Sequence, residues 1–233
     1  KIISSEVRNL AKRRNVSKQL KKNRIHMTFH FNKKLFLYLS LVFILMTIIG
    51  TITHELGHYL SAKIMGFNSR VNYGMTILEN NQNKSMSNKE YFLFTLGGPI
   101  QTMLTGTLGI ALLFLTRKPY NQIENLSILQ WIMIFMSLFW LRQIANMFTW
   151  VLFFFINGKF GVRGDEIKIA QYLELPKWSV LLSTAIIGAF VLWQVIFRFI
   201  PEKVRFTFIL SGLAGGISGY ILWLEIFGKI LMP

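Results

Sequence analysis

Two histidines and a glutamate are the residues of this sequence best suited to chemistry. They stand together as His54-Glu55-Leu56-Gly57-His58, an H-E-x-x-H motif. In a helix, the four-residue spacing places both imidazoles on one face, where they can share a zinc ion. The glutamate then lies beside the metal, where it can take a proton from zinc-bound water. The motif therefore predicts a metal-dependent hydrolytic centre.

A catalytic zinc needs a third protein ligand and one open position for water. Asp165 is the only aspartate in the chain, and it follows the third of five long apolar segments. Counting those segments puts Asp165 on the same side of a membrane as His54 and His58, which end the first segment. We predict Asp165 as the third ligand, with Glu166 as the alternative. Asp165 could instead cap a helix over residues 167–173, or do both.

The elements that must position these residues are membrane helices. Of the 233 residues, 52% are hydrophobic and 15% are charged, whereas soluble domains carry about 25% charged residues. A helix crosses the bilayer core with about 20 apolar residues, and five segments are long enough. These are residues 35–53, 91–116, 126–157, 179–197 and 206–224. We therefore expect an all-α, multi-pass integral membrane protein with five transmembrane helices.

The chain has no cysteine, which excludes thiolate metal ligands, a thiol nucleophile and disulfides. Arg142 is the single charge inside the third apolar segment. It could contact an acidic site group or a substrate carbonyl, or it could mark the end of an interfacial helix.

Residues 71–78, after the motif, have strand-like composition and predict a short β-hairpin. Its open edge could hold an extended substrate by main-chain hydrogen bonds.

A strongly basic arm precedes the first apolar segment. Residues 1–34 hold eleven of the 26 Lys and Arg residues, opposed by one Glu. Aromatic residues interleave this arm only at Phe29 and Phe31, so we expect contact with anionic lipid or plain solvation rather than nucleic-acid binding. His26 and His30 lie in the arm and are expected to be surface residues. Basic residues are spread nearly evenly over both ends of the spans, so they assign no orientation.

The motif and its surroundings resemble the site-2 proteases, a family of intramembrane zinc metalloproteases. The family pattern H-E-x-G-H-x-x-x-A-x-x-x-G is matched in full from His54 to Gly66. Gly98-Pro99 in the second span resembles the family's Gly-Pro motif, and Asn157 precedes Asp165 by the family's eight residues. The resemblance covers residues 35–173 and implies three core helices around zinc. It also implies Glu55 as the base and Asn157 as an orienting group.

The sequence departs from the family pattern at several positions. Thr102 stands where the family has an asparagine, and Glu166 stands where it has a glycine. The family's prolines between the third-motif asparagine and aspartate are also missing. We expect three regions: a basic arm (1–34), a site-2-protease-like catalytic core (35–173) and two C-terminal transmembrane helices (174–233).

The resemblance implies a zinc-dependent intramembrane endopeptidase acting on membrane-protein or peptide substrates. Zn²⁺ would be held by His54, His58 and Asp165, and Asn157 or Arg142 would contact the oxyanion. The alternative is a non-catalytic membrane scaffold, or a subunit of a larger membrane complex. The intact Glu55 favours the enzyme, because a scaffold has no need of the base.

Overall fold

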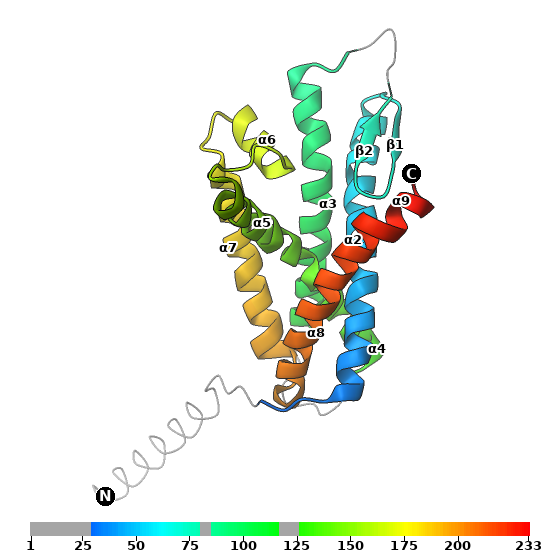
Figure 1. Cartoon of the computed structure of the whole chain (residues 1–233), viewed down its shortest axis with the longest axis vertical. Coiled ribbons are helices and arrows are strands. Elements are labelled where there is room, and N and C mark those ends of the chain that lie inside the picture. The colour runs from blue at the N-terminus through cyan, green and yellow to red at the C-terminus, as the bar shows by residue number, and fades with distance from the viewer. Residues whose placement is uncertain (1–28, 80–84, 117–125) are drawn as a thin grey trace, which may run out of the picture.

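The computed structural model describes residues 29–79, 85–116 and 126–233 of the chain. Within these ranges, five helical segments are long and apolar enough to cross a membrane, as the sequence predicts. The basic arm lies outside the described residues up to position 28, and His26 lies outside them too. Figure 1 shows the five segments side by side, with the β-hairpin and a short helix near one end of the bundle.

The first two spanning segments are the continuous helices α2 and α3, whereas the other three each contain a local change of helix type. Their bounds are α2 (Lys33–Ile64); α3 (Asn88–Leu115); α4 (Ile128–Ser137), a 3-10 turn (Leu138–Trp140) and α5 (Leu141–Asn157); α7 (Trp178–Gln194) and a π-helical turn (Val195–Phe199); α8 (Glu202–Ile221), a π-helical turn (Leu222–Phe227) and α9 (Gly228–Leu231). The short helix α6 (Asp165–Tyr172) connects the third segment to the fourth.

Polar caps start the first three segments outside their apolar runs. The Asn32 side chain accepts a hydrogen bond from the Leu35 amide, 3.0 Å away, at the start of α2. Ser87 and Ser127 each begin a reciprocal capping box, with Glu90 and Gln130 respectively. Such caps satisfy backbone N–H groups that the first helical turn leaves unpaired. α2 also continues past residue 53 through the whole H-E-x-x-H motif, so the helical spacing predicted for the motif is present.

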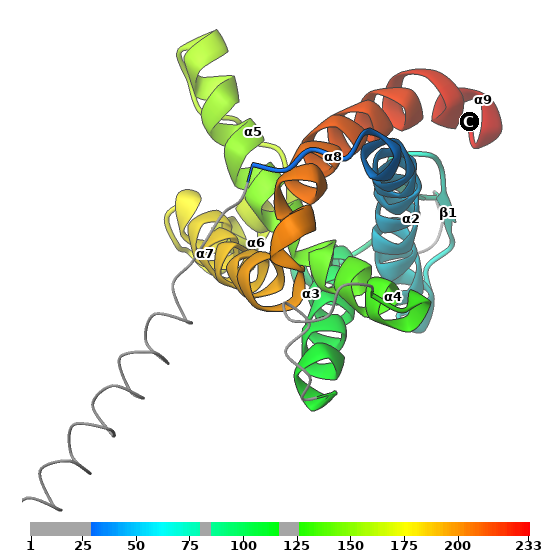
Figure 2. The ribbon, with the colours of Figure 1, turned by 90° about the horizontal axis from the view of Figure 1, so that it is seen from below.

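The third segment bends where the sequence predicts one continuous span. The 3-10 turn Leu138–Trp140 separates α4, which packs on α3, from α5, which packs on α7. Two glycines of α3 accommodate this bend: a Cβ on Gly109 would overlap the Ser137 amide, and one on Gly106 would lie 2.5 Å from the Trp140 ring. Figure 2 shows the far end of α5 pointing away from the other helices.

A two-stranded antiparallel hairpin follows α2, in agreement with the prediction. Strands β1 (Ser69–Val71) and β2 (Thr76–Leu78) pair with Ser69 opposite Leu78. The Asn72 side chain accepts hydrogen bonds from the backbone amides of Gly74 and Met75, and these bonds close the turn. The hairpin therefore folds back along the end of α2 that carries the motif.

The last segment packs along α2 through glycines, as small-residue spacing in membrane helices favours. Gly215 of α8 abuts the Ser40 carbonyl so closely that a Cβ there would overlap it, and Phe43 lies against the same glycine. Next to this contact, Phe43, Phe135 and Phe208 form an aromatic cluster with ring centroids 5.2–6.4 Å apart. This cluster joins α2, α4 and α8 below the motif.

The close approach of α8 to α2 predicts the effect of a single methyl group. We expect Gly215→Ala to lower the free energy of unfolding by about 1–3 kcal/mol, because the added Cβ forces the backbones apart. Gly216→Ala is the matched control, since nothing lies within 4 Å of a Cβ at Gly216. Thermal unfolding in one detergent compares the two variants. Equal melting temperatures would show that the contact does not contribute to stability.

Candidate metal centre

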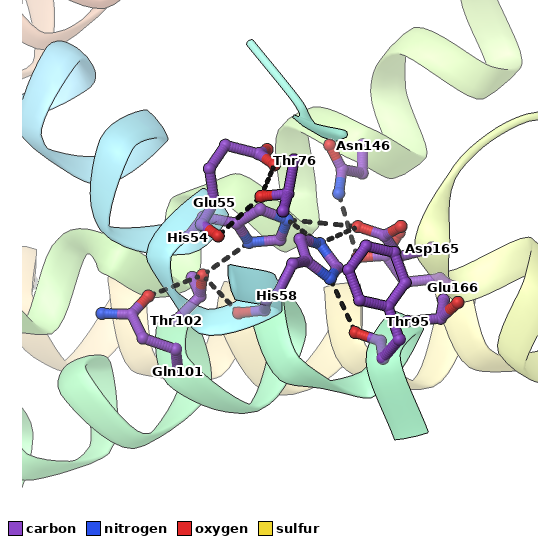
Figure 3. A network of polar contacts seen from close by, with 12 residues as sticks. His54, Glu55, His58, Thr76, Thr95, Gln101, Thr102, Asn146, Asp165 and Glu166 are labelled. Carbon is purple, nitrogen blue, oxygen red and sulfur yellow. Dashed lines mark hydrogen bonds and ion pairs between the residues drawn. The ribbon is translucent and has the colours of Figure 1, made fainter. Parts of the chain in front are cut away.

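Three side-chain atoms from α2 and α6 converge on one point beside α3. The Asp165 Oδ2 atom lies 3.1 Å from His54 Nε2 and 3.2 Å from His58 Nε2. The two Nε2 atoms lie 3.3 Å apart. Figure 3 shows the two imidazoles and the carboxylate pointing toward one another. His54 and His58 are 1% and 5% exposed, respectively, so the donors meet inside the protein.

The triangle of donors fits a zinc ion. Ligands of a tetrahedral zinc with bonds of about 2.0–2.1 Å lie about 3.3–3.4 Å from one another, and the three separations in the structure are close to this value. Two imidazole nitrogens and one carboxylate oxygen also form a common donor set for catalytic zinc, which leaves the fourth position for water. His54, His58 and Asp165 are therefore the residues that could hold the metal.

The other ring nitrogen of each histidine is bonded to α3, which fixes the ring. His58 Nδ1 donates to the Phe94 carbonyl over 2.8 Å, and His54 Nδ1 lies 2.9 Å from the Thr102 hydroxyl. That hydroxyl donates to the Gly98 carbonyl over 3.1 Å, so it can accept from His54. Because each Nδ1 acts as the donor, each Nε2 is left with its lone pair toward the centre.

Glycines of α3 leave room for the imidazoles. A Cβ on Gly98 would overlap His58 Nε2 and lie 2.6 Å from His54 Nε2. One residue earlier, the backbones of Gly97 and Gly57 approach so closely that neither position can accept a Cβ without movement. The Gly-Pro pair noted in the sequence thus begins with a residue whose missing side chain makes space for both rings.

Asp165 begins α6 instead of capping it. Gly164 holds the N-cap position with φ of 123°, in the region that glycine favours, and it makes no side-chain cap. The Asp165 Oδ2 atom faces the lone pairs of both Nε2 atoms at 3.1 and 3.2 Å. Three electron-pair donors that face one another in this way are the arrangement that a shared cation satisfies.

Glu166, the alternative ligand, has a different partner. Glu166 is 2% exposed, and its Oε1 atom accepts a hydrogen bond of 3.0 Å from Asn146 of α5. Burial raises the pKa of Glu166, and the hydrogen bond from Asn146 and the charge of Arg142 offset only part of that rise. Asp165, and not Glu166, contacts the imidazoles in the described residues.

Glu55 lies between the histidines and the hairpin. Its side chain is 5% exposed, and its carboxylate accepts a hydrogen bond of 3.1 Å from the Thr76 hydroxyl of β2. A ring nitrogen of His54, a ring nitrogen of His58 and a carboxylate oxygen of Glu55 lie within 4.8 Å of one another. The glutamate is therefore close enough to reach a water molecule held beside the two rings.

The structure does not bring Asn157 to this centre. Asn157 is the last residue of α5, its side chain is exposed, and it donates to the Phe153 carbonyl of its own helix. The asparagine of α5 that reaches α6 is Asn146, which the eight-residue spacing to Asp165 passed over. Its position four residues after Arg142, on one helical face, was the available signal.

Arg142 lies one turn before Asn146 on α5, the helix whose Asn146 side chain bonds to Glu166. Within the described residues, its Nε atom is buried without a hydrogen-bond partner. A buried donor without a partner is costly, so this Nε–H group could pair with an acceptor that a substrate brings.

Comparison with known proteins identifies the family. The model of a family described as Peptidase M50B-like matches residues 33–195, which is more than half of the chain. No curated protein matches the chain, and no solved structure matches it. The chain belongs to the Peptidase M50B-like family of site-2-protease-like intramembrane metalloproteases. It is accordingly a multi-pass membrane protein with a buried H-E-x-x-H group.

The bond between His54 and Thr102 predicts a loss of metal affinity when the hydroxyl is removed. We expect Thr102→Val to weaken zinc binding about 10- to 100-fold, the usual effect of losing a partner that orients a ligand. Thr102→Ser keeps the hydroxyl and should retain the affinity. Zinc retained against graded chelator measures the effect, with thermal unfolding as the control for folding. Equal retention by the valine and wild-type proteins would contradict the role of Thr102.

Proposed function

We propose that this protein is a zinc-dependent endopeptidase that hydrolyses peptide bonds in membrane-spanning or membrane-adjacent segments of other proteins. Membership of an intramembrane metalloprotease family supports the reaction class. The single observation that carries the proposal is the meeting of His54, His58 and Asp165 with Glu55 beside them. Such a grouping inside five membrane-length helices suits hydrolysis within or next to the bilayer.

The chain's own residues divide the work. His54 and His58 would bind zinc through Nε2, and Asp165 would bind it through Oδ2. Bound zinc would supply a Lewis acid that activates water and stabilises negative charge on the scissile carbonyl. Glu55 would take the proton from the attacking water and deliver it to the leaving amine nitrogen. The buried position of Glu55 keeps bulk water away from these transfers.

Arg142 is the residue that we propose for the carbonyl oxygen of the substrate. Its Nε atom is buried without a partner among the described residues, and a developing oxyanion is an acceptor that would match it. Asn157 is not part of this proposal, because its exposed side chain bonds to its own helix.

The hairpin suits a substrate that has lost its helical structure. A helical peptide hides its scissile carbonyls, so a segment must become extended before cleavage. β1 and β2 form a sheet of two strands, and each strand therefore has an outer edge. We propose that one of these edges binds the extended segment by main-chain hydrogen bonds.

The two residues that motivate the non-catalytic scaffold both have partners at the site. The scaffold reading rests on Thr102 and Glu166, which differ from the family pattern. Thr102 nevertheless bonds to the ring of His54, and Glu166 bonds to Asn146. Both departures are therefore compatible with an ordered metal site.

The role of Glu55 predicts the behaviour of an isosteric variant. We expect Glu55→Gln to abolish cleavage of a single-span substrate peptide, because the amide cannot accept the proton. The variant should still bind about one zinc per chain, because Glu55 is not one of the three proposed ligands. Cleavage is followed by mass spectrometry in detergent and in liposomes. Undiminished cleavage by the variant would refute this mechanism.

The choice between the two acidic residues predicts different zinc contents. Asp165→Ala should lose most of the bound zinc, because only two imidazole ligands remain. Glu166→Gln should keep its zinc, since the amide oxygen can still accept the hydrogen bond from Asn146. Elemental analysis of purified protein measures the stoichiometry, and thermal unfolding checks folding. The opposite result would make Glu166 the third ligand.

A further inference from the structure

The Thr76 hydroxyl joins the hairpin to the residue proposed as the catalytic base. It lies 2.7 Å from the Glu55 main-chain carbonyl and 3.1 Å from the Glu55 Oε2 atom. Figure 3 shows Thr76 directly beside Glu55, on the side opposite α3. A threonine hydroxyl has one hydrogen and two lone pairs, so it donates to one of these oxygens at a time and keeps both within reach.

This contact restricts a side chain that is otherwise adaptable. Glutamate has three rotatable side-chain bonds, and holding it in one conformation costs free energy that a partner must supply. Reactivity is steep in geometry, since a displacement of 1 Å can cost about 100-fold in rate. A hydroxyl fixed beside Oε2 therefore aligns the carboxylate before the substrate arrives.

The position of Thr76 depends in turn on the C-terminal end of the chain. Trp223 Nε1 donates to the carbonyl of Tyr73, at the hairpin turn, over 2.7 Å. The Tyr73 amide donates to the Met232 carbonyl over 3.0 Å. Gly228 fits against the same residue, because a Cβ there would lie 2.7 Å from Tyr73 Cβ. We call these contacts of Trp223, Gly228 and Met232 with Tyr73 the hairpin clamp.

The geometry of the last segment serves the hairpin clamp. Trp223 is buried and lies within the π-helical turn Leu222–Phe227, between α8 and α9. A π-helical turn redirects the side chains that follow it, and such turns are frequent at functional sites. The residues of the clamp on this segment all lie beyond residue 195, where the family match ends.

We propose that Thr76 is a positioning residue for Glu55, and that the hairpin clamp holds Thr76 in place. This inference rests on the proposed endopeptidase activity. It adds that the fifth spanning segment, outside the region matched by the family, determines how the base is aligned. Loss of the Thr76 hydroxyl or of the clamp should therefore slow the chemical step without removing the metal ligands.

The test compares Thr76→Val with Thr76→Ser on a fluorogenic single-span peptide that wild type cleaves and Glu55→Gln does not. We expect Thr76→Val to lower kcat about tenfold or more, with KM within about twofold and zinc content unchanged. Thr76→Ser should restore most of kcat, because it keeps the hydroxyl. Thr53→Val is the matched control, since within the described part of the chain the Thr53 hydroxyl bonds only to carbonyls of its own helix.

The clamp is tested by Trp223→Phe, which removes the N–H donor and keeps an aromatic ring. Hydrogen exchange of the hairpin amides should become faster in this variant, and kcat should fall while zinc remains bound. Hydrogen exchange is measured by mass spectrometry and does not depend on activity. Unchanged exchange and an unchanged kcat would overturn the clamp.

The remaining outcomes separate this inference from the proposed function. Equal kcat in wild type and Thr76→Val would overturn the positioning role alone, as would a higher KM with unchanged kcat, which indicates substrate binding. Failure of Thr76→Ser to restore kcat would assign the residue to packing. Absence of cleavage by the zinc-loaded wild type would overturn the endopeptidase and, with it, the role of Thr76.

Discussion

The close contact between α2 and α3 at Gly57 and Gly97 is the constraint on which the rest of the structure depends. Phe94, Gly98 and Thr102 are spaced four residues apart on the side of α3 that faces α2. Phe94 presents its carbonyl, Gly98 leaves space where a side chain would be, and Thr102 presents its hydroxyl. His58 and His54 can reach these groups only because the two backbones approach so closely. At membrane depth, where polar groups must find partners within the protein, this seam both satisfies the imidazoles and aims them at Asp165.

The sequence predicts those features that depend on a local residue pattern or on the number of membrane spans between two residues. Helical spacing within the motif, the five apolar runs and the turn-flanked strands are local signals, and the structure contains each of them. Counting spans also places Asp165 on the side where the structure has it. The 3-10 turn at Leu138–Trp140 and the contact of Trp223 with Tyr73 had no such signal. They depend on how helices distant in sequence fit together, and so does the contact of Asn146 with Glu166.

The last spanning segment is also more closely joined to the motif-bearing helix than a division at residue 174 suggests. Ser211 donates to the Phe36 carbonyl over 3.2 Å, and Gly215 abuts Ser40. Lower down, the Asn32 amide donates to the Thr207 hydroxyl over 3.1 Å. α2 thus has α3 on one side and α8 on another. The division into regions stays a prediction. The helix that carries the histidines is nevertheless supported both by α3, from the predicted catalytic core, and by α8, from the predicted C-terminal region.

The two outer edges of the hairpin bear on how the bilayer meets this protein. Hydrocarbon cannot satisfy the unpaired N–H and C=O groups of a sheet edge, so such an edge requires water or lipid headgroups around it. Thr76 of this hairpin touches Glu55, and α2 continues nine residues further to Ile64, which is about 13 Å along the helix at 1.5 Å per residue. A helix that approaches from the lipid on this side would therefore meet the polar edge of the hairpin before it met the buried carboxylates.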